Sequence, residues 1–441
     1  MNDVCIMRIA IVGTGYVGLV SAAGWAALGH DVTCIDIDTD KVKLINKGVP
    51  PIFEIGLSET LQTAIRAGKL RATTNYSLIR DSEVIFIAVG TPSKDDGSMD
   101  VRHIQACSES IARELEKKKH FVVVAIRSTV LPGTTEKIVG EILEKAGFKR
   151  GVDFGLAMVP EFLKEGTALE DFQKPDRVII GCSDDKTRNV FEKMYQAFNC
   201  PKQFTSLKTA EMIKYASNAM LATKLSFTNE ISAMCEKLGI DVDSVMNGVG
   251  LDRRIGPLFL IAGAGFGGSC FPKDVKALIH KSNELGVKPR LLESVMDVNM
   301  QQQKKLVAML KESMDIRGKS IAILGLAFKN GTDDVRESSA VTTIKMLLDG
   351  NAKVRACDPQ AIESMKKIFP ESAQMYYTDD WGDCLKGCHA ALLITAWPEF
   401  RKNALEYKKA LGNAPLIDAR RVLPAGEAER NGLKYYCIGR G

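Results

Sequence analysis

The 441-residue sequence lacks the features that mark several classes of protein. No residue type dominates any segment, and hydrophobic residues make up 45% and charged residues 26%, which excludes disordered and fibrous chains. A large charge excess is also missing, because 59 Lys and Arg against 54 Asp and Glu leave a formal net charge of only +5. This balance argues against a nucleic-acid partner, whereas a mild positive excess suits an anionic substrate.

The eleven cysteines show no CxxC pair and no other metal-ligand spacing, and an odd number cannot all pair. This usage is typical of a reducing compartment, so we predict a cytoplasmic protein without a metal site. The charge-free stretch 9–29 is long enough to span a bilayer, but four glycines interrupt it. We therefore predict neither a membrane span nor a signal peptide.

Short apolar runs alternate with helical patterns in both halves of the chain. Two runs, 8–13 and 319–325, end on glycine and are each followed by a helical pattern. Helical patterns also lie between the later strands of the first half, for example at 104–118. Further strands are predicted at 32–36, 84–89, 121–126, 178–181, 354–358, 390–395 and 416–418. This alternation predicts an α/β fold with parallel sheets that are covered by helices on both faces.

A long helical pattern at 208–238 lies between the two halves. The residues that recur at helical spacing in it are Met212, Ile213, Ala216, Ala219, Met220, Thr223 and Phe227. A helix of about thirty residues exceeds the usual globular length. It either joins two domains or packs against a second copy of itself, and a helix buried within one subunit is the alternative.

The sequence Gly13-Thr-Gly15-Tyr-Val-Gly18 follows an apolar strand and opens a helical pattern. Gly13 allows a tight turn, Gly15 lets a pyrophosphate approach the backbone, and Gly18 lets the helix pack on the sheet. Asp36, at the end of the next strand, is placed to accept hydrogen bonds from ribose hydroxyls and to repel a 2′-phosphate. These features predict NAD binding. Lys41 either reaches the dinucleotide or is a solvated lysine at a helix start.

Cys270 lies in the glycine-rich stretch 265–274, where Pro272 predicts that a helix begins just beyond it. The positive end of that helix and nearby Lys273 would both lower the pKa of the thiol and favour a nucleophilic thiolate. Asp274 would lie about one turn away. The alternative is a small buried hydrophobic residue, which is the usual role of a lone cysteine.

Two further pairs are spaced for one helical turn. Lys214 and Asn218 could donate hydrogen bonds to a developing oxyanion, or form an ordinary surface pair. Glu161 and Glu165 follow an apolar strand and a proline, so we expect them one helical turn apart at a strand end. Active-site residues of α/β enzymes commonly lie at such strand ends. Acidic residues in a first helical turn also occur without any catalytic role.

The second half lacks GxGxxG after its first strand, so a second pyrophosphate in the same pose is not expected there. Charged residues nevertheless concentrate just after this strand, at Lys329, Asp333, Asp334 and Arg336. A different nucleotide-like ligand would fit at this edge of the sheet. A solvated loop would carry similar charge.

Several motifs together resemble the nucleotide-sugar 6-dehydrogenases, the UDP-glucose/GDP-mannose dehydrogenase family. They occur in family order from the first strand to 418–421, and within the family the members that act on UDP-glucose match best. The motifs are Gly13–Gly18, 89–92 (VGTP), 128–130 (STV), 160–162 (PEF), 265–274 (GFGGSCFPKD), 328–329 (FK), 336–339 (RESS) and 418–421 (DARR).

The resemblance implies two doubly wound Rossmann-like domains joined by a long central helix. It implies an NAD-binding domain at 1–200, a central helical domain with a dimer interface at 201–300, and a UDP-sugar-binding domain at 301–441. The implied reaction is the NAD-dependent, four-electron oxidation of the C6 alcohol of UDP-glucose to UDP-glucuronate, through a cysteine thiohemiacetal and a thioester. The protein would be a homodimer or a higher homo-oligomer.

Site residues follow from the same resemblance. The implied catalytic residues are Cys270, Lys214, Asp274, Asn218, Glu161 and Thr129. The implied NAD-binding residues are Gly13, Gly15, Val17, Gly18, Asp36, Lys41, Thr91, Thr129, Glu165, Lys273 and Arg336. The implied residues for the UDP-sugar are Glu161, Phe162, Leu163, Lys214, Asn218, Arg254, Phe259, Leu260, Ile261, Ala262, Gly263, Gly267, Lys329 and Arg421. Arg254 resembles an arginine that reaches the substrate of the neighbouring subunit.

One position departs from the family pattern, because some UDP-glucose enzymes carry a lysine in the loop after Phe259 where this chain has Ile261. UDP-N-acetylhexosamines and GDP-mannose are therefore alternative substrates for the same chemistry. Two other functions stay open. A single-step hydroxyacid-type NAD dehydrogenase would use Lys214 but would not need Cys270, and a silent NAD-binding regulator would need neither.

Overall fold

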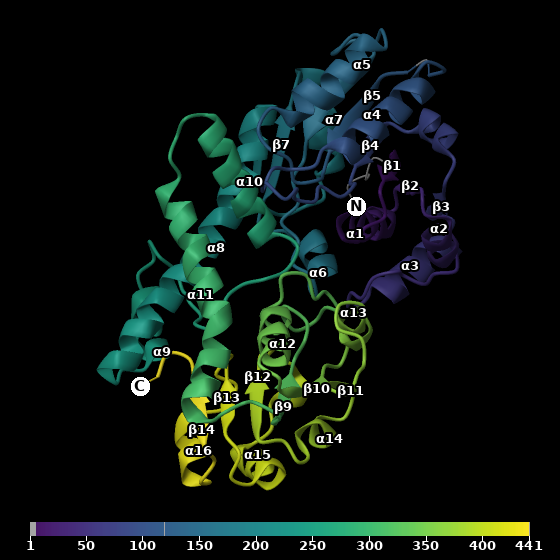
Figure 1. The fold of residues 1–441 in the computed structure, drawn as a ribbon. Coiled ribbons are helices and arrows are strands. Elements are labelled where there is room, and N and C mark those ends of the chain that lie inside the picture. Colours follow the sequence, from purple (N-terminus) through teal and green to yellow (C-terminus); the bar gives the residue numbers. More distant parts are fainter. Residues whose placement is uncertain (1–5, 119, 441) are drawn as a thin grey trace. The chain divides into compact units, whose positions relative to one another are not determined.

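The computed structural model describes residues 6–118 and 120–440, which form two compact units. Unit 1 extends to Ser217 and includes Lys276–Lys281, and unit 2 consists of Asn218–Val275 and the chain from Ser282 onward. Each unit is built on one sheet (Figure 1). The predicted domain boundaries at residues 200 and 300 stay a prediction.

The sheet of unit 1 has the order β3-β2-β1-β4-β5-β6-β7-β8. The central strands β4 and β5 are apolar along their whole length and β1 is apolar after its first residue, as expected for strands that are covered on both faces. The strands are β1 (Arg8–Val12), β2 (Asp31–Ile35), β3 (Leu70–Thr73), β4 (Val84–Ile87), β5 (Val122–Ile126), β6 (Phe154–Met158), β7 (Val178–Cys182) and β8 (Lys202–Thr205).

One pair of strands departs from the predicted parallel arrangement, because β6 and β7 are antiparallel. A parallel neighbour requires a connection that returns along the whole sheet. The segment 159–177 between them contains only the short helix α6 (Ala168–Gln173) and otherwise irregular backbone. Strand β7 therefore begins at the same edge of the sheet at which β6 ends.

Helices cover both faces of this sheet. On one face Ile9 and Phe86 belong to a cluster with Leu19, Trp25 and Phe191, and on the other Ala10 and Ile85 belong to a cluster with Ile104. The doubly wound α/β arrangement is thus confirmed. Besides α6, the helices are α1 (Tyr16–Ala27), α2 (Thr39–Asn46), α3 (Leu57–Arg66), η1 (Tyr76–Asp81), α4 (Arg102–Leu115), η2 (Thr135–Gly140), α5 (Glu141–Lys145) and α7 (Asp185–Met194).

Unit 2 contains an all-parallel sheet of order β11-β10-β9-β12-β13-β14 with one large apolar core. Its strands are β9 (Ser320–Leu324), β10 (Lys353–Cys357), β11 (Met375–Thr378), β12 (Ala390–Leu393), β13 (Leu416–Asp418) and β14 (Tyr435–Cys437). Its helices are α9 (Val242–Gly250), α11 (Arg290–Ser313), α12 (Ser339–Asp349), α13 (Ile362–Lys366), α14 (Trp381–Leu385), η3 (Pro398–Phe400), α15 (Ala404–Leu411) and α16 (Ala425–Arg430).

Two helices contain residues of both units. The long helix α8 (Leu207–Leu238) confirms the helix predicted at 208–238, and the boundary between the units falls after its residue Ser217. Helix α10 (Phe271–Glu284) begins directly after Cys270, as Pro272 predicts.

Candidate active site

The turn between β1 and α1 uses its three glycines in three different ways. Gly13 has a φ of +95°, and a Cβ there would lie 2.8 Å from the carbonyl oxygen of Ala88. A Cβ on Gly18 would lie 1.9 Å from the carbonyl oxygen of Gly13, whereas a Cβ on Gly15 would meet nothing within 4 Å. Gly13 and Gly18 therefore serve the close packing of the turn, and Gly15 leaves open space at the start of α1, where a pyrophosphate binds in this type of fold.

The carboxylate of Asp36 is bound to the same turn. Its Oδ2 accepts hydrogen bonds from the backbone N–H of Thr14 at 2.8 Å and from the Thr14 hydroxyl at 2.5 Å, and its Oδ1 accepts one from the N–H of Asp38 at 3.0 Å. Burial by itself raises the pKa of Asp36. These hydrogen bonds and the Lys41 ammonium lower it by more, so the pKa lies below its ordinary value. An ionised carboxylate at this position fits the ribose of NAD and disfavours a 2′-phosphate.

Two threonines predicted to contact the cofactor lie together at the ends of neighbouring strands. Thr91 follows β4, and its hydroxyl donates to the carbonyl oxygen of Thr129, after β5, at 3.0 Å. Val17 lies in the first turn of α1. These residues, Asp36 and the glycine turn all belong to unit 1, so the part of the predicted cofactor site within this unit is consistent with a dinucleotide.

Lys214 and Glu161 form a buried ion pair in unit 1, with 2.9 Å between Nζ and Oε1. Lys214 is 3% and Glu161 5% exposed. Burial by itself raises the pKa of Glu161, but the Lys214 ammonium, the N–H of Leu163 and the more distant Arg127 shift it below its ordinary value. The Leu163 N–H donates to Oε2 at 2.6 Å. Glu161 is therefore an ionised carboxylate next to a cation.

The predicted helical turn between Glu161 and Glu165 is wrong. Residues 159–164 have no regular secondary structure, and α6 begins only at Ala168. The reason is buried Glu54, whose carboxylate accepts the N–H groups of Gly166 at 2.7 Å and Ala168 at 2.8 Å. Glu54 thus caps the helix late, and Glu161 is left in an irregular segment. Sequence reasoning missed Glu54 because no local motif links it to a helix more than a hundred residues away.

Cys270 immediately precedes α10 in unit 2, and its side chain is exposed. Its carbonyl oxygen accepts the N–H of Asp274 at 2.9 Å, which closes the first turn of the helix. The sulfur lies 3.6 Å from the hydroxyl oxygen of Ser269. An exposed thiol at the positive end of a helix is the setting predicted for a nucleophile, and it differs from the buried positions of most other cysteines in the described residues.

Asp274 is 1% exposed and gathers two other predicted residues around it. Its Oδ1 accepts a hydrogen bond from Lys273 Nζ at 2.5 Å, and its Oδ2 accepts one from Asn218 Nδ2 at 2.6 Å. The Asn218 amide is thereby oriented, one turn along α8 from Lys214. Asn218, Lys273 and Asp274 form a connected polar cluster one turn beyond Cys270.

The glycine frame of Cys270 packs against protein. A Cβ on Gly267 would lie 2.1 Å from the carbonyl oxygen of Glu337, and one on Gly268 would lie 2.7 Å from the ring of Phe328. The N–H of Gly268 also donates to the carbonyl oxygen of Arg336 at 2.8 Å. The cysteine loop therefore lies directly beside the charged segment that follows β9.

Three models of one protein family match the chain in succession. They describe the NAD-binding domain (residues 7–199), the central domain (208–301) and the UDP-binding domain (322–425) of the UDP-glucose/GDP-mannose dehydrogenase family. The chain belongs to this family. It is therefore an NAD-dependent oxidoreductase, and the predicted cofactor is confirmed.

Several relatives match over nearly the whole chain. A UDP-glucose 6-dehydrogenase of Haloferax volcanii is 42% identical over 98% of this chain and 100% of its own length. One from Bacillus subtilis is 42% identical over 98% of both chains. The structure of a UDP-glucose dehydrogenase from Pyrobaculum islandicum has a TM-score of 0.93 and 37% identity, covering 100% of this chain and 99% of its own.

Of the residues predicted to bind the UDP-sugar, those at 259–263 form a loop of unit 2. Phe259 has a φ of +65°, and its ring centroid lies 6.1 Å from that of Phe271. Ile261 is exposed, whereas Leu260 and Ala262 are buried. The N–H of Gly263 donates to Asn229 Oδ1 at 2.9 Å, which ties the loop to α8.

Two arginines follow each other after β13, and their side chains have different surroundings. Arg421 pairs with Asp241 and, at 2.7 Å, with Asp243, and it donates to the carbonyl oxygen of Ile438 at 2.9 Å. Arg420 approaches the 259–263 loop, since its Nη1 lies 2.9 Å from where a Cβ on Gly263 would be. The role predicted for Arg421 stays a prediction, and the geometry gives Arg420 the better position beside this loop.

Three further predicted cations belong to unit 2, where Arg254 and Arg336 are exposed and Lys329 is half-buried. Arg254, after α9, is exposed and forms a bidentate pair with Asp252, and Arg336 forms the same kind of pair with Asp334. Lys329 lies with its ammonium 5.7 Å from the ring centroid of Phe328. In the part of the chain that the structure describes, no helix is long and apolar enough to cross a membrane, and no group of side chains could hold a metal ion.

Proposed function

We propose that this protein oxidises the C6 alcohol of UDP-glucose to the carboxylate of UDP-glucuronate, with Cys270 as the covalent nucleophile. The observation that carries the proposal is the exposed thiol at the start of α10, followed one turn later by the buried Asp274 with its partners Lys273 and Asn218. The choice of UDP-glucose follows the relatives at 42% identity over 98% of the chain.

NAD would be held by the glycine turn, Asp36, Thr91 and Thr129, and each of the two oxidation steps would transfer one hydride to a separate NAD⁺. The described residues fit it because Gly15 leaves open space at the start of α1 and Asp36 is an ionised acceptor beside it. Lys41, Val17 and Glu165 complete the proposed contacts in unit 1. Lys273 and Arg336 are the proposed contacts from unit 2.

The chain's own residues supply the remaining chemistry. The C6 alcohol becomes an aldehyde when its hydroxyl loses a proton and C6 loses a hydride, which NAD⁺ would accept, and Lys214 and Asn218, as hydrogen-bond donors, stabilise the oxyanion that develops. The Cys270 thiolate adds to the aldehyde carbon and forms the C–S bond of a thiohemiacetal, whose oxidation gives a thioester. Asp274, held by Lys273 and Asn218, orders a water molecule or takes up a proton.

Water then hydrolyses the thioester. Glu161, which is ionised, accepts a proton from this water, with Thr129 near the same molecule. The oxygen of water bonds to C6, the C–S bond breaks, and the thiolate of Cys270 is restored. The sum is one UDP-glucose, two NAD⁺ and one water converted to UDP-glucuronate, two NADH and three protons.

We also propose that the UDP-sugar is bound by the 160–163 segment, the 259–263 loop, Gly267, Lys329 and Arg420 or Arg421, and that the protein is a cytoplasmic homodimer. Its long helix supports the dimer, because Met220, Phe227 and Met234 are exposed at seven-residue spacing on α8. Arg254, exposed on unit 2, would reach the substrate of the partner subunit.

The deciding experiment measures NADH formed per sugar consumed, with UDP-glucose, UDP-N-acetylhexosamines and GDP-mannose in parallel. We expect two NADH per UDP-glucose and little turnover of the others. One NADH per sugar would contradict the thioester route, and two NADH on another sugar alone would keep the mechanism and change the substrate. The Cys270→Ser variant should still bind NAD and substrate but form no acid, whereas a single-step dehydrogenase would stay active.

A further inference from the structure

We propose that Arg177 is a positioning residue that holds Glu161 against Lys214, a role that rests on the proposed function of this pair. Arg177 immediately precedes β7 and is half-buried. Its guanidinium lies over the ring of Phe162, 4.0 Å from the centroid, and its Nη2 donates to the hydroxyl of Ser217 at 3.3 Å.

These two contacts reach both sides of the buried pair. Phe162 directly follows Glu161, and Ser217 lies three residues after Lys214 on α8, on the same side of the helix. The Lys214 ammonium is itself 5.3 Å from the centroid of the Phe162 ring. The aromatic ring thus has a cation from Arg177 and a cation from Lys214 as neighbours, an arrangement in which each cation–π contact is favourable. Arg177 thereby links the loop that carries Glu161 to the helix that carries Lys214.

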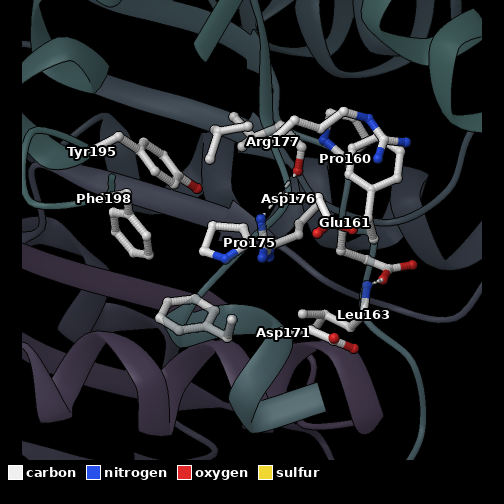
Figure 2. A pocket seen from close by; sticks show the side chains of 14 residues that line it. Pro160, Glu161, Leu163, Asp171, Pro175, Asp176, Arg177, Tyr195 and Phe198 are labelled. Carbon is white, nitrogen blue, oxygen red and sulfur yellow. Dashed lines mark hydrogen bonds between the residues drawn. The ribbon is translucent and has the colours of Figure 1, made fainter. Parts of the chain in front are cut away.

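The Glu161 segment needs such support because residues 159–164 have no regular secondary structure. In the part of the chain that the structure describes, the Glu161 carboxylate is bound by Lys214 and by the N–H of Leu163, and Glu161 is only 5% exposed. Figure 2 shows Glu161, Leu163 and Arg177 among the side chains around a pocket of unit 1, with Tyr195 and Phe198 on its other side. A segment that borders a pocket on one side can shift into it once the stacking of Arg177 is lost.

The direction of β7 explains why the sequence did not reveal this role. A parallel strand at 178–181 would begin at the edge of the sheet opposite to the strand end that precedes Pro160. Because β7 is antiparallel to β6, Arg177 lies instead at the edge where β6 ends and Glu161 follows. If β7 were parallel to β6, Arg177 would lie at the opposite edge of the sheet, far from Glu161.

The test compares Arg177→Met, which keeps an unbranched apolar stem but removes the guanidinium group, with Arg177→Lys and wild type. Arg188→Met is the matched control, since Arg188 also lies over an aromatic ring of unit 1, 4.7 Å from the centroid of Phe204, and is half exposed. We expect Arg177→Met to lower kcat about tenfold to a hundredfold, as small misplacements of catalytic groups do. KM for NAD should stay unchanged, Arg177→Lys should restore part of kcat, and Arg188→Met should resemble wild type.

The readout specific to positioning is the titration of Glu161, followed by NMR of ¹³C-carboxyl-labelled glutamate without substrate and assigned with Glu161→Gln. When the carboxylate moves away from Lys214 but stays buried, its pKa rises, and the acidic limb of kcat should shift to higher pH in the same variant. An unchanged Glu161 titration in a folded Arg177→Met protein would overturn the proposal. This titration needs no turnover. It therefore tests the role of Arg177 even if the wild-type protein does not oxidise UDP-glucose, so failure of this proposal and failure of the proposed function can be told apart.

Discussion

At the scale of single residues, the buried pair of Lys214 and Glu161 gives the sharpest expectation. Removing one partner of such a pair leaves the other charge buried and uncompensated, which destabilises proteins by about 3–5 kcal/mol. We therefore expect Lys214→Met to lower the free energy of unfolding by this order, measured by urea denaturation at pH 7. The double variant Lys214→Met/Glu161→Gln removes the stranded charge and should recover a large part of the loss. A double variant as unstable as the single one would contradict this account.

The pH dependence of the same pair follows from the sign of the Glu161 shift. Its pKa in the folded protein lies below the ordinary value of 4.5, so the folded state binds its proton more weakly than the unfolded state. The stabilisation is therefore complete above the ordinary pKa and is lost as the pH falls through the folded pKa. Unfolding measured from pH 7 to pH 3 should show wild type losing stability below about pH 4.5, and Glu161→Gln should lose less over the same interval.

At the scale of elements, two glycines in the turn between β1 and α1 have different roles: Gly18 is needed for folding and Gly15 for cofactor binding. Gly18→Ala places a Cβ 1.9 Å from the carbonyl oxygen of Gly13, so backbone must move, and we expect a loss of about 2 kcal/mol or more. Gly15 has a φ of −69°, which alanine adopts readily, and nothing lies within 4 Å of its Cβ position. Gly15→Ala should fold normally and raise KM for NAD at least tenfold because the methyl group occupies the space for the pyrophosphate. Equal melting temperatures for the two variants would refute this division.

The elements also show what the sequence could predict. The central strands follow from apolar runs because they are buried, and α8 follows from the helical spacing of its apolar residues. The edge strands β3, β8, β11 and β14 were missed since their exposed residues break up the apolar pattern. The prediction of a helical turn at 161–165 was wrong because a distant residue, Glu54, determines where α6 begins. Local sequence signals do not contain such long-range contacts.

The site was predictable to a similar extent. Cys270, Asp36 and the glycine turn carry dense local motifs, whereas spacing alone left Lys214, Asn218 and Glu161 with non-catalytic alternatives, and the resemblance to a family gave them their implied roles. Arg177 has no motif of its own, and its place depends on the antiparallel direction of β7. Arg420 and Arg421 are adjacent in the sequence, so only their contacts tell them apart.

At the scale of the whole molecule, the proposed dimer can be tested through Arg254, which would complete the active site of the partner subunit. In the described chain the Arg254 side chain is 89% exposed, and its ion-pair partner is Asp252, two residues away. The exposed residues Met220, Phe227 and Met234 on α8 provide an apolar surface for a second copy. If Arg254 acts across the interface, activity requires two subunits.

Subunit complementation tests this directly. Arg254→Ala and Cys270→Ser should each be inactive alone, because one lacks the arginine for its partner's site and the other lacks the nucleophile. In a mixed dimer, the site with an intact Cys270 receives the intact Arg254 of the other subunit, so co-expression in equal amounts should restore about a quarter of wild-type activity. If Arg254 acts within its own subunit, neither site of the mixed dimer is complete and no activity returns. Titration of active sites in the purified mixed dimer then gives one functional site per two subunits in the first case and none in the second.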